Sequence, residues 1–174
     1  MYFNLIKIMK TLVTILIFLK SIISVDAQEI QKGEYYPNSE NKKFEGTWTF
    51  INGSTTFKVV LMSKKTFIEE MGIFTDCLVG KYYLKNDGLE VADYLNSNET
   101  PISFGVASKN KSSILNANFN DIRKNKIGAL ELELLSNKVQ KLKWKLLNTE
   151  DVRINGKGKD KDFSVPINII LSKA

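Results

Sequence analysis

Residues 44–63, FEGTWTFINGSTTFKVVLMS, decide the fold, because they predict a β-hairpin with one apolar face. The turn lies at Asn52-Gly53-Ser54, where Asn-Gly favours a type I′ turn and Gly-Ser a type II′ turn, since both place a residue that tolerates positive φ where the turn needs it. Either two-residue loop puts the same apolar residues on one face: Trp48, Phe50, Phe57, Val59 and Leu61. The rest of the chain must cover this face or close around it.

The first 27 residues have the pattern of a secretory signal peptide. Two lysines come before an apolar run over residues 11–19, and Val25-Asp26-Ala27 provides small residues ahead of a cleavage site. We therefore expect cleavage between Ala27 and Gln28, with Met9 as an alternative start. A retained membrane anchor is the other interpretation, but Lys20 interrupts a run that is shorter than the roughly 20 apolar residues of a membrane span.

The mature chain is predicted to hold one domain. Residues 28–43 are polar and predict an extended lead-in, and residues 44–174 are long enough for a single core. No later apolar run is long enough for a transmembrane helix. We expect an exported protein, either periplasmic or extracellular.

Composition excludes several functions. The chain has a formal net charge of +6, and removal of the signal peptide lowers it to +4; the only arginines are Arg123 and Arg153. Because nucleic-acid recognition relies on arginine and on basic runs interleaved with aromatic residues, we expect no nucleic-acid partner. The chain has no histidine, which removes histidine-based triads and the commonest zinc ligand. Cys77 is the only cysteine, so no internal disulfide can form.

Further strands are predicted along the chain. Lys64-Lys65 is expected to form a turn, and residues 66–74 fit neither the helical nor the strand period. Residues 76–85 alternate as a strand, followed by a strong Asn86-Asp87-Gly88 turn. The remaining strands are expected at residues 89–95, where a short helix is the alternative, and at 102–107, 114–122 and 163–171, the last starting properly after Pro166.

A second hairpin is predicted at residues 130–146. Leucines alternate with Glu131 and Glu133 on its first strand, and Leu142, Trp144 and Leu146 alternate with lysines on its second. A three-residue loop centred on Asn137 would place Leu132 opposite Leu142 and Leu130 opposite Trp144. On the other face it would pair Glu133 with Lys141 and Glu131 with Lys143, each pair contributing roughly 0.2–1 kcal/mol.

These segments predict an all-β protein, an antiparallel meander of about eight to ten strands. A lipocalin-like β-barrel would remove the exposed strand edges, and a β-sandwich is the alternative.

Two resemblances support this fold class. Gly46-Thr47-Trp48 on a first strand resembles the Gly-x-Trp signature of lipocalins and other calycins. The resemblance implies that Trp48 closes one end of an eight-stranded barrel under a basic residue from a late strand, either Arg153 or a lysine of the final strands. The chain differs from secreted lipocalins in having no disulfide pair and no obvious C-terminal helix.

The chain also resembles a family of small exported Bacteroidota proteins of unknown function. The matching segments are residues 46–48, 78–82 (LVGKY), 141–145 (KLKWK) and, more loosely, 166–171 (PINIIL). The resemblance implies source and export, and it supplies no catalytic residues.

Candidate site residues each have a structural alternative. The apolar set forms either a ligand cavity or a solid core, since small barrels are often filled by side chains: Trp48, Phe50, Phe57, Val59, Leu132, Leu142 and Trp144. Cys77, next to Leu78 and Val79, is expected to be buried and inert. Possible acid/base carboxylates are Glu69, Glu70, Asp76 and Asp93. Lysines interleave the acidic residues of loop 155–162, which argues against calcium there.

Three classes of function remain. The residues favour a non-enzymatic binder of a small apolar molecule, without cofactor or metal. A protein-interaction or surface-assembly module with a filled core is the alternative, and it needs an exposed apolar patch or a free strand edge. A carboxylate-dependent hydrolase would need acidic side chains that converge in a cleft.

Overall fold

The computed structural model describes residues 31–107, 113–135, 140–149, 153–154, 157–158 and 162–174. Residues 32–174 form one compact unit, to which all the following observations refer. The predicted signal peptide lies outside the described residues. Within the described part of the chain, no helix combines the length and the apolar character that a membrane crossing requires.

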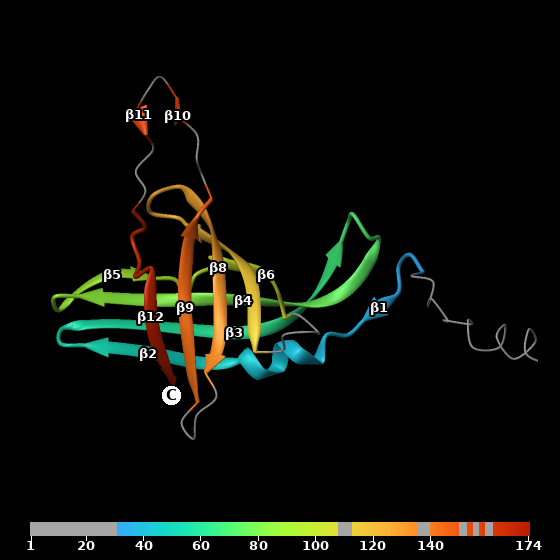
Figure 1. Cartoon of the computed structure of the whole chain (residues 1–174), viewed down its shortest axis with the longest axis horizontal. Coiled ribbons are helices and arrows are strands. Elements are labelled where there is room, and N and C mark those ends of the chain that lie inside the picture. The colour runs from blue at the N-terminus through green and yellow to red at the C-terminus, as the bar shows by residue number, and fades with distance from the viewer. Residues whose placement is uncertain (1–30, 108–112, 136–139, 150–152, 155–156, 159–161) are drawn as a thin grey trace, which may run out of the picture. The chain divides into compact units, whose positions relative to one another are not determined.

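Eight strands form a closed antiparallel barrel (Figure 1). Each strand pairs with the next along the barrel, β12 pairs with both β9 and β2, and a β4–β6 pairing completes the closure. This up-and-down order is the predicted lipocalin-like meander, and the β-sandwich alternative is not observed. The barrel strands are β2 (Gly46–Asn52), β3 (Thr55–Ile68), β4 (Ile73–Asn86), β6 (Ile102–Ala107), β7 (Ile114–Asp121), β8 (Lys126–Leu135), β9 (Lys141–Asn148) and β12 (Asn168–Lys173).

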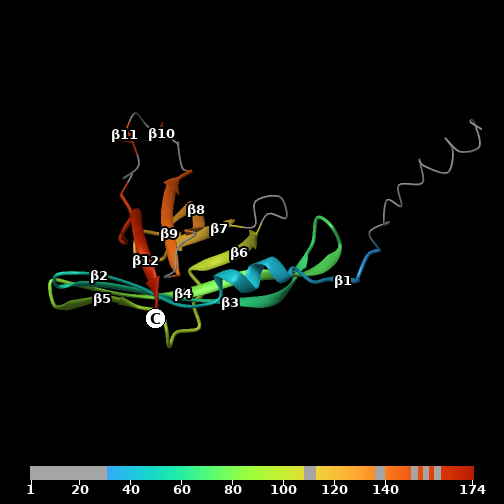
Figure 2. The ribbon, with the colours of Figure 1, turned by 60° about the horizontal axis from the view of Figure 1, so that its bottom comes forward.

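The remaining described elements are short. The predicted lead-in contains β1 (Tyr35–Tyr36), which pairs in parallel with β4, and the 3₁₀ helix η1 (Ser39–Phe44). Figure 2 shows η1 beside β3 and β6. β5 (Leu89–Asp93) continues from β4 by a hairpin, while β10 (Arg153–Ile154) and β11 (Lys157–Gly158) form a separate pair.

The β2–β3 hairpin has the predicted faces. Asn52 pairs with Thr55, so Gly53-Ser54 is the two-residue loop, and Gly53 adopts a φ of +56°. Of the two turns predicted at this site, the Gly-Ser loop is therefore the one that forms, with positive φ at its first position. Trp48 pairs with Val59 and thus shares the inner face with the other predicted apolar residues.

The predicted turn at Lys64-Lys65 is wrong. β3 continues through both lysines, which pair with Cys77 and Asp76 of β4, and the chain turns only at residues 69–72. β2 pairs with β3 only as far as Leu61, so the later part of β3 extends beyond the barrel. Solvent reaches both lysines there, and lysine is therefore compatible with strand structure. Figure 1 shows this projecting end of the β3–β4 hairpin.

The predicted β8–β9 register is wrong by two residues. Leu132 pairs with Trp144 rather than with Leu142, and Leu134 pairs with Leu142. The faces are as predicted, because side chains alternate with a period of two and a two-residue shift preserves their orientation. The observed register gives Leu134 an apolar partner, whereas the predicted register placed it opposite Gln140.

Candidate functional site

Aromatic side chains fill the centre of the barrel. The ring centroid of Phe57 lies 5.2 Å from that of Trp144 and 5.6 Å from that of Tyr82. Phe119 lies 5.7 Å from Tyr82 and 5.6 Å from Trp144, which closes the circuit of contacts. These four residues are fully buried and come from β3, β4, β7 and β9. Because β3 and β9 are not neighbouring strands, their contact crosses the interior, so side chains occupy this level of the barrel.

The residues predicted as cavity or core belong to the hydrophobic core around these four rings. Phe50 is partly buried and packs against it, and the others are fully buried. Sequence alternation therefore identified the inward positions on β2, β3, β8 and β9. It did not single out Tyr82 or Phe119, although both lie on strands whose alternation was recognised.

Helix η1 closes one end of the barrel. Phe44 is buried in the core, and its carbonyl accepts a 2.8 Å hydrogen bond from the Trp48 indole nitrogen. The fully buried Asn41 amide donates to the carbonyl oxygens of Asp76 (2.7 Å) and Gly105 (3.4 Å) and accepts from the Ala107 N–H at 2.9 Å. This side chain thus satisfies backbone groups where β4 and β6 separate.

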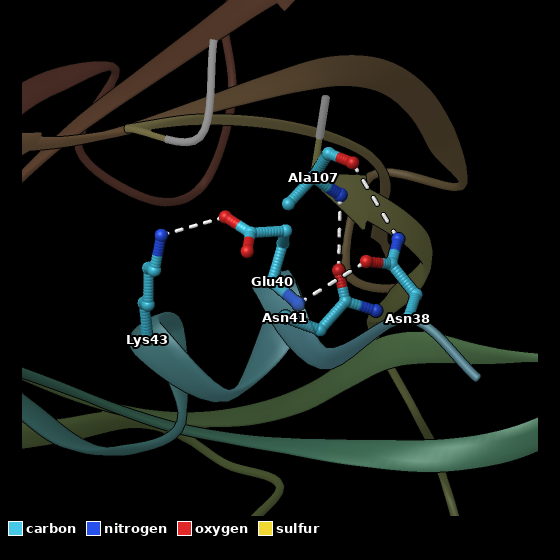
Figure 3. A network of polar contacts seen from close by, with 5 residues as sticks. All are labelled: Asn38, Glu40, Asn41, Lys43 and Ala107. Atoms are coloured by element: carbon cyan, nitrogen blue, oxygen red, sulfur yellow. Dashed lines mark hydrogen bonds and ion pairs between the residues drawn. The ribbon is translucent and has the colours of Figure 1, made fainter. Parts of the chain in front are cut away.

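Figure 3 shows the polar network around η1. Asn38 accepts a hydrogen bond from the Glu40 N–H at 3.2 Å and donates to the Ala107 carbonyl at 3.5 Å. Glu40 forms an ion pair with Lys43 at 2.6 Å. Asn38 is the N-cap of this helix, and the sequence of the segment had predicted only an extended lead-in.

A cation lies over Trp48, as the lipocalin resemblance implied. The Lys173 amine on β12 is 5.3 Å from the Trp48 ring centroid. Arg153, the other predicted candidate, lies on β10, and its side chain is outside the described residues. Gly46 has a φ of +120°, and a Cβ built there would be 3.0 Å from the Lys173 Cε atom. Glycine thus provides both the backbone conformation and the space for Lys173.

The segment before β12 covers the other end of the barrel. The fully buried Asp121 carboxylate accepts from the Ser164 N–H at 2.5 Å and from the Ser164 hydroxyl at 2.7 Å. Phe163 packs against Phe119 with 6.2 Å between centroids, and Val165 is buried. Asp121 therefore holds this segment across the barrel end.

Tyr82 is the unusual polar residue of the core. Its hydroxyl is buried without a hydrogen-bond partner among the described residues. Burial raises the pKa of this hydroxyl far above its usual range, and the nearby Tyr94 and Asp121 add to the effect. Tyr82 therefore stays neutral inside the folded barrel.

The projecting end of the β3–β4 hairpin exposes aromatic side chains. Tyr35 and Phe67 are each 44% exposed, and the centroids of Phe67 and Phe74 are 5.0 Å apart. The Lys65 amine lies 4.8 Å from the ring centroids of both Tyr35 and Phe74. The Tyr35 hydroxyl donates to Asp76 at 2.6 Å, and this hydrogen bond is the main cause of the raised Tyr35 pKa. We call the segment formed by β1 and residues 62–77, including the turn at residues 69–72, the projecting hairpin.

The candidate carboxylates do not converge. Asp76 accepts hydrogen bonds from Tyr35 and from the Asn38 N–H, whereas Asp93 pairs with Tyr83, seven residues further along β4 and thus about 23 Å away. Glu69 and Glu70 lie in the exposed turn of the projecting hairpin. Asp76 therefore has a structural role.

Cys77 is buried, as predicted. Burial is the main cause that raises the pKa of its thiol. A raised pKa lowers the thiolate fraction at neutral pH, which fits an inert side chain.

The strand order, the filled interior and the closed ends define a small lipocalin-like antiparallel β-barrel. The chain belongs to DUF6705, a family of unknown function, which matches residues 9–174. No curated protein and no solved structure matches the chain.

Proposed function

We propose that the protein is an exported, non-enzymatic binding module that engages its partner through the projecting hairpin rather than inside the barrel. The observation that carries the proposal is the circuit of Phe57, Tyr82, Phe119 and Trp144, which occupies the barrel centre with fully buried rings. A small apolar ligand would have to displace these side chains. This supports the interaction-module alternative over the small-ligand binder.

The outer surface supplies what an interaction module needs. The projecting hairpin presents Tyr35 and Phe67 to solvent, and the exposed Met71 lies in its turn. Aromatic residues and methionine are enriched in protein interfaces. The Lys65 amine lies over the Tyr35 ring, and the Asp76 carboxylate accepts a hydrogen bond from the Tyr35 hydroxyl, so the surface offers polar as well as apolar groups. Such a mixed surface suits a protein partner.

A photo-crosslinking experiment tests the location of the interface. A benzophenone amino acid replaces Phe67 in the full chain expressed in its own host, and the control carries it at the exposed Asn118 on β7. We expect a discrete adduct from position 67 and none from position 118. Equal adducts from both positions, or none from either, would contradict the proposal.

A ligand titration tests the interior. Trp48 and Trp144 are both fully buried, so a ligand entering the core would change their emission. We expect no saturable change with fatty acids, retinoids or a hydrophobic dye. Saturable quenching that disappears in a Leu142→Trp variant would instead establish the small-molecule binder.

Export and origin are part of the same proposal. The basic start, the apolar run and Val25-Asp26-Ala27 support cleavage after Ala27, and the resemblance described above supports a Bacteroidota source. The mature chain would be periplasmic or extracellular. N-terminal sequencing of the protein from its host should find Gln28 first, and a chain that still begins at Met1 or Met9 would refute export by this signal.

A further inference from the structure

Resting on the proposed function, we propose that the partner adds an extended, acidic segment to the sheet as a new strand along β3, at residues 63–68. We call this the open edge of β3. On one side this edge pairs with β4, and on the other side no strand of the described residues pairs with it. Strand addition at an exposed edge is a common mode of peptide recognition, in which backbone hydrogen bonds provide affinity.

At the open edge, backbone groups of β3 face away from β4 toward a side where no described strand pairs with them. In the β2–β3 hairpin, Asn52 and Thr55 flank a two-residue loop and form a hydrogen-bonded pair, so odd-numbered residues of β3 face β2 with their backbone groups. The same alternation continues past Leu61, beyond the last pair that β3 forms with β2. The N–H and C=O groups of Ser63, Lys65 and Phe67 therefore point away from β4. Lys65 and Phe67 are exposed, whereas the Ser63 hydroxyl is buried, so the accessible part of this edge is residues 64–68.

The opposite edge of the projecting hairpin already binds an extended segment. β1 runs in parallel along β4, with Tyr35 opposite Phe74 and Tyr36 opposite Thr75. The Phe74 N–H donates to the Glu34 carbonyl at 2.8 Å, and the Thr75 hydroxyl donates to the Tyr36 carbonyl at 2.7 Å. The protein's own strand β1 thus pairs with one edge of the hairpin, while no strand of the described residues pairs with the other edge.

Charge favours an acidic partner over a second copy of the chain. Lys64 and Lys65 lie in the middle of the open edge, and both are exposed. Antiparallel pairing of two copies about this point would place lysines opposite each other, which is destabilising. A segment with acidic residues at these positions would pair favourably, and its apolar residues would contact Met62 and Phe67, which are 46% and 44% exposed.

Lysines on an edge strand can also serve only to prevent aggregation. A peptide titration distinguishes the two roles. The probe is a fluorescein-labelled ten-residue peptide of alternating valine and threonine with two central glutamates, and the matched peptide carries two central lysines. Fluorescence anisotropy with the mature protein should show saturable binding of the glutamate peptide, at least about tenfold tighter than the lysine peptide.

Two variants at one position separate backbone from side-chain contacts. Phe67→Ala and Phe67→Pro both remove the ring, but only proline also removes an N–H that points to the open edge. We expect Phe67→Pro to weaken peptide binding at least about fivefold more than Phe67→Ala. Circular dichroism confirms that both variants keep the barrel.

A charge reversal tests the preference directly. The Lys64→Glu, Lys65→Glu double variant should bind the lysine peptide more tightly than the glutamate peptide. The inference fails if neither peptide binds or if the two Phe67 variants bind the peptide equally. It also fails if sedimentation shows a dimer that only Phe67→Pro dissociates, because a second copy of the chain would then occupy the edge. If the Phe67 crosslink still forms when the peptides fail, the proposed function stands and only the mode of binding is wrong.

Discussion

Trp144→Ala tests the filled barrel at its centre. Trp144 is fully buried, its ring lies 5.2 Å from that of Phe57 and 5.6 Å from that of Phe119, and its indole nitrogen donates to the Pro166 carbonyl at 2.8 Å. Removing such a side chain from a core costs about 3–5 kcal/mol. The Pro166 carbonyl also loses its partner, which adds about 1–3 kcal/mol if it stays buried. We therefore expect the free energy of unfolding to fall by at least about 4 kcal/mol.

Urea denaturation followed by circular dichroism measures this loss without relying on the tryptophan that is removed. Because domains of this size have about 5–15 kcal/mol of stability, Trp144→Ala can approach complete unfolding. Trp144→Phe is therefore included, since it keeps a ring against Phe57 and should cost less than the alanine variant.

The matched control is the neighbouring Lys143→Ala. Lys143 points outward, and its amine lies 3.4 Å from the Glu133 carboxylate at the surface. Loss of this ion pair should cost less than about 1 kcal/mol. If the free energies of unfolding of Trp144→Ala and Lys143→Ala differ by less than about 1 kcal/mol, the assignment of inner and outer faces on β9 is wrong.

Four further predictions concern the barrel ends and the buried polar groups. Asp121→Ala should lower the free energy of unfolding by about 2–4 kcal/mol in urea melts, because it leaves the Ser164 N–H and hydroxyl unpaired. Tyr82→Phe should raise stability by about 1 kcal/mol at neutral pH, since the buried hydroxyl has no hydrogen-bond partner within the described part of the chain. The unfolded Tyr82 releases its proton near pH 10, whereas the folded pKa is higher, so wild-type stability should fall as pH rises above about 10, and melts of the variant should lack this component. Lys173→Leu should cost about 0.5–1 kcal/mol in the same melts by removing the cation–π contact, and an unchanged midpoint would show that the contact is not stabilising. Cys77 should react with iodoacetamide much more slowly in the folded protein than in urea, and equal rates would show that it is accessible.

Local sequence patterns were sufficient for the inner faces of β2, β8 and β9 and of the barrel part of β3. Alternation identified Trp48 and Phe57 as partners on one face, and the Gly53-Ser54 turn sets the pairing of β2 with β3. The β8–β9 register was harder to predict for two reasons. The connection between the strands is longer, and both the apolar and the charged residues match in two different registers. Glu133 meets Lys143 in the observed register, and it would have met Lys141 in the other.

The candidate site was less predictable. Lys64 and Lys65 resemble a turn in sequence, and only the pairing with Cys77 and Asp76 shows that β3 projects beyond the barrel. In sequence, Asn41 is one residue of a polar lead-in. In the structure its amide hydrogen-bonds backbone groups that are left unpaired where β4 and β6 separate. Such roles depend on contacts between residues distant in sequence, which alternation does not encode.

The sequence by itself determined an all-β meander and its inward-facing residues, because period-two alternation and turn residues act over a few neighbouring positions. The tertiary structure alone decided that the barrel is filled and that one hairpin carries an open edge. The ring contact between Phe57 and Trp144 joins β3 to β9, which are distant in sequence and lie on one barrel because β12 pairs with both β2 and β9. Among the described residues, no strand pairs with β3 on this side beyond Leu61, because β2 begins at Gly46, opposite Leu61, while β3 and β4 continue.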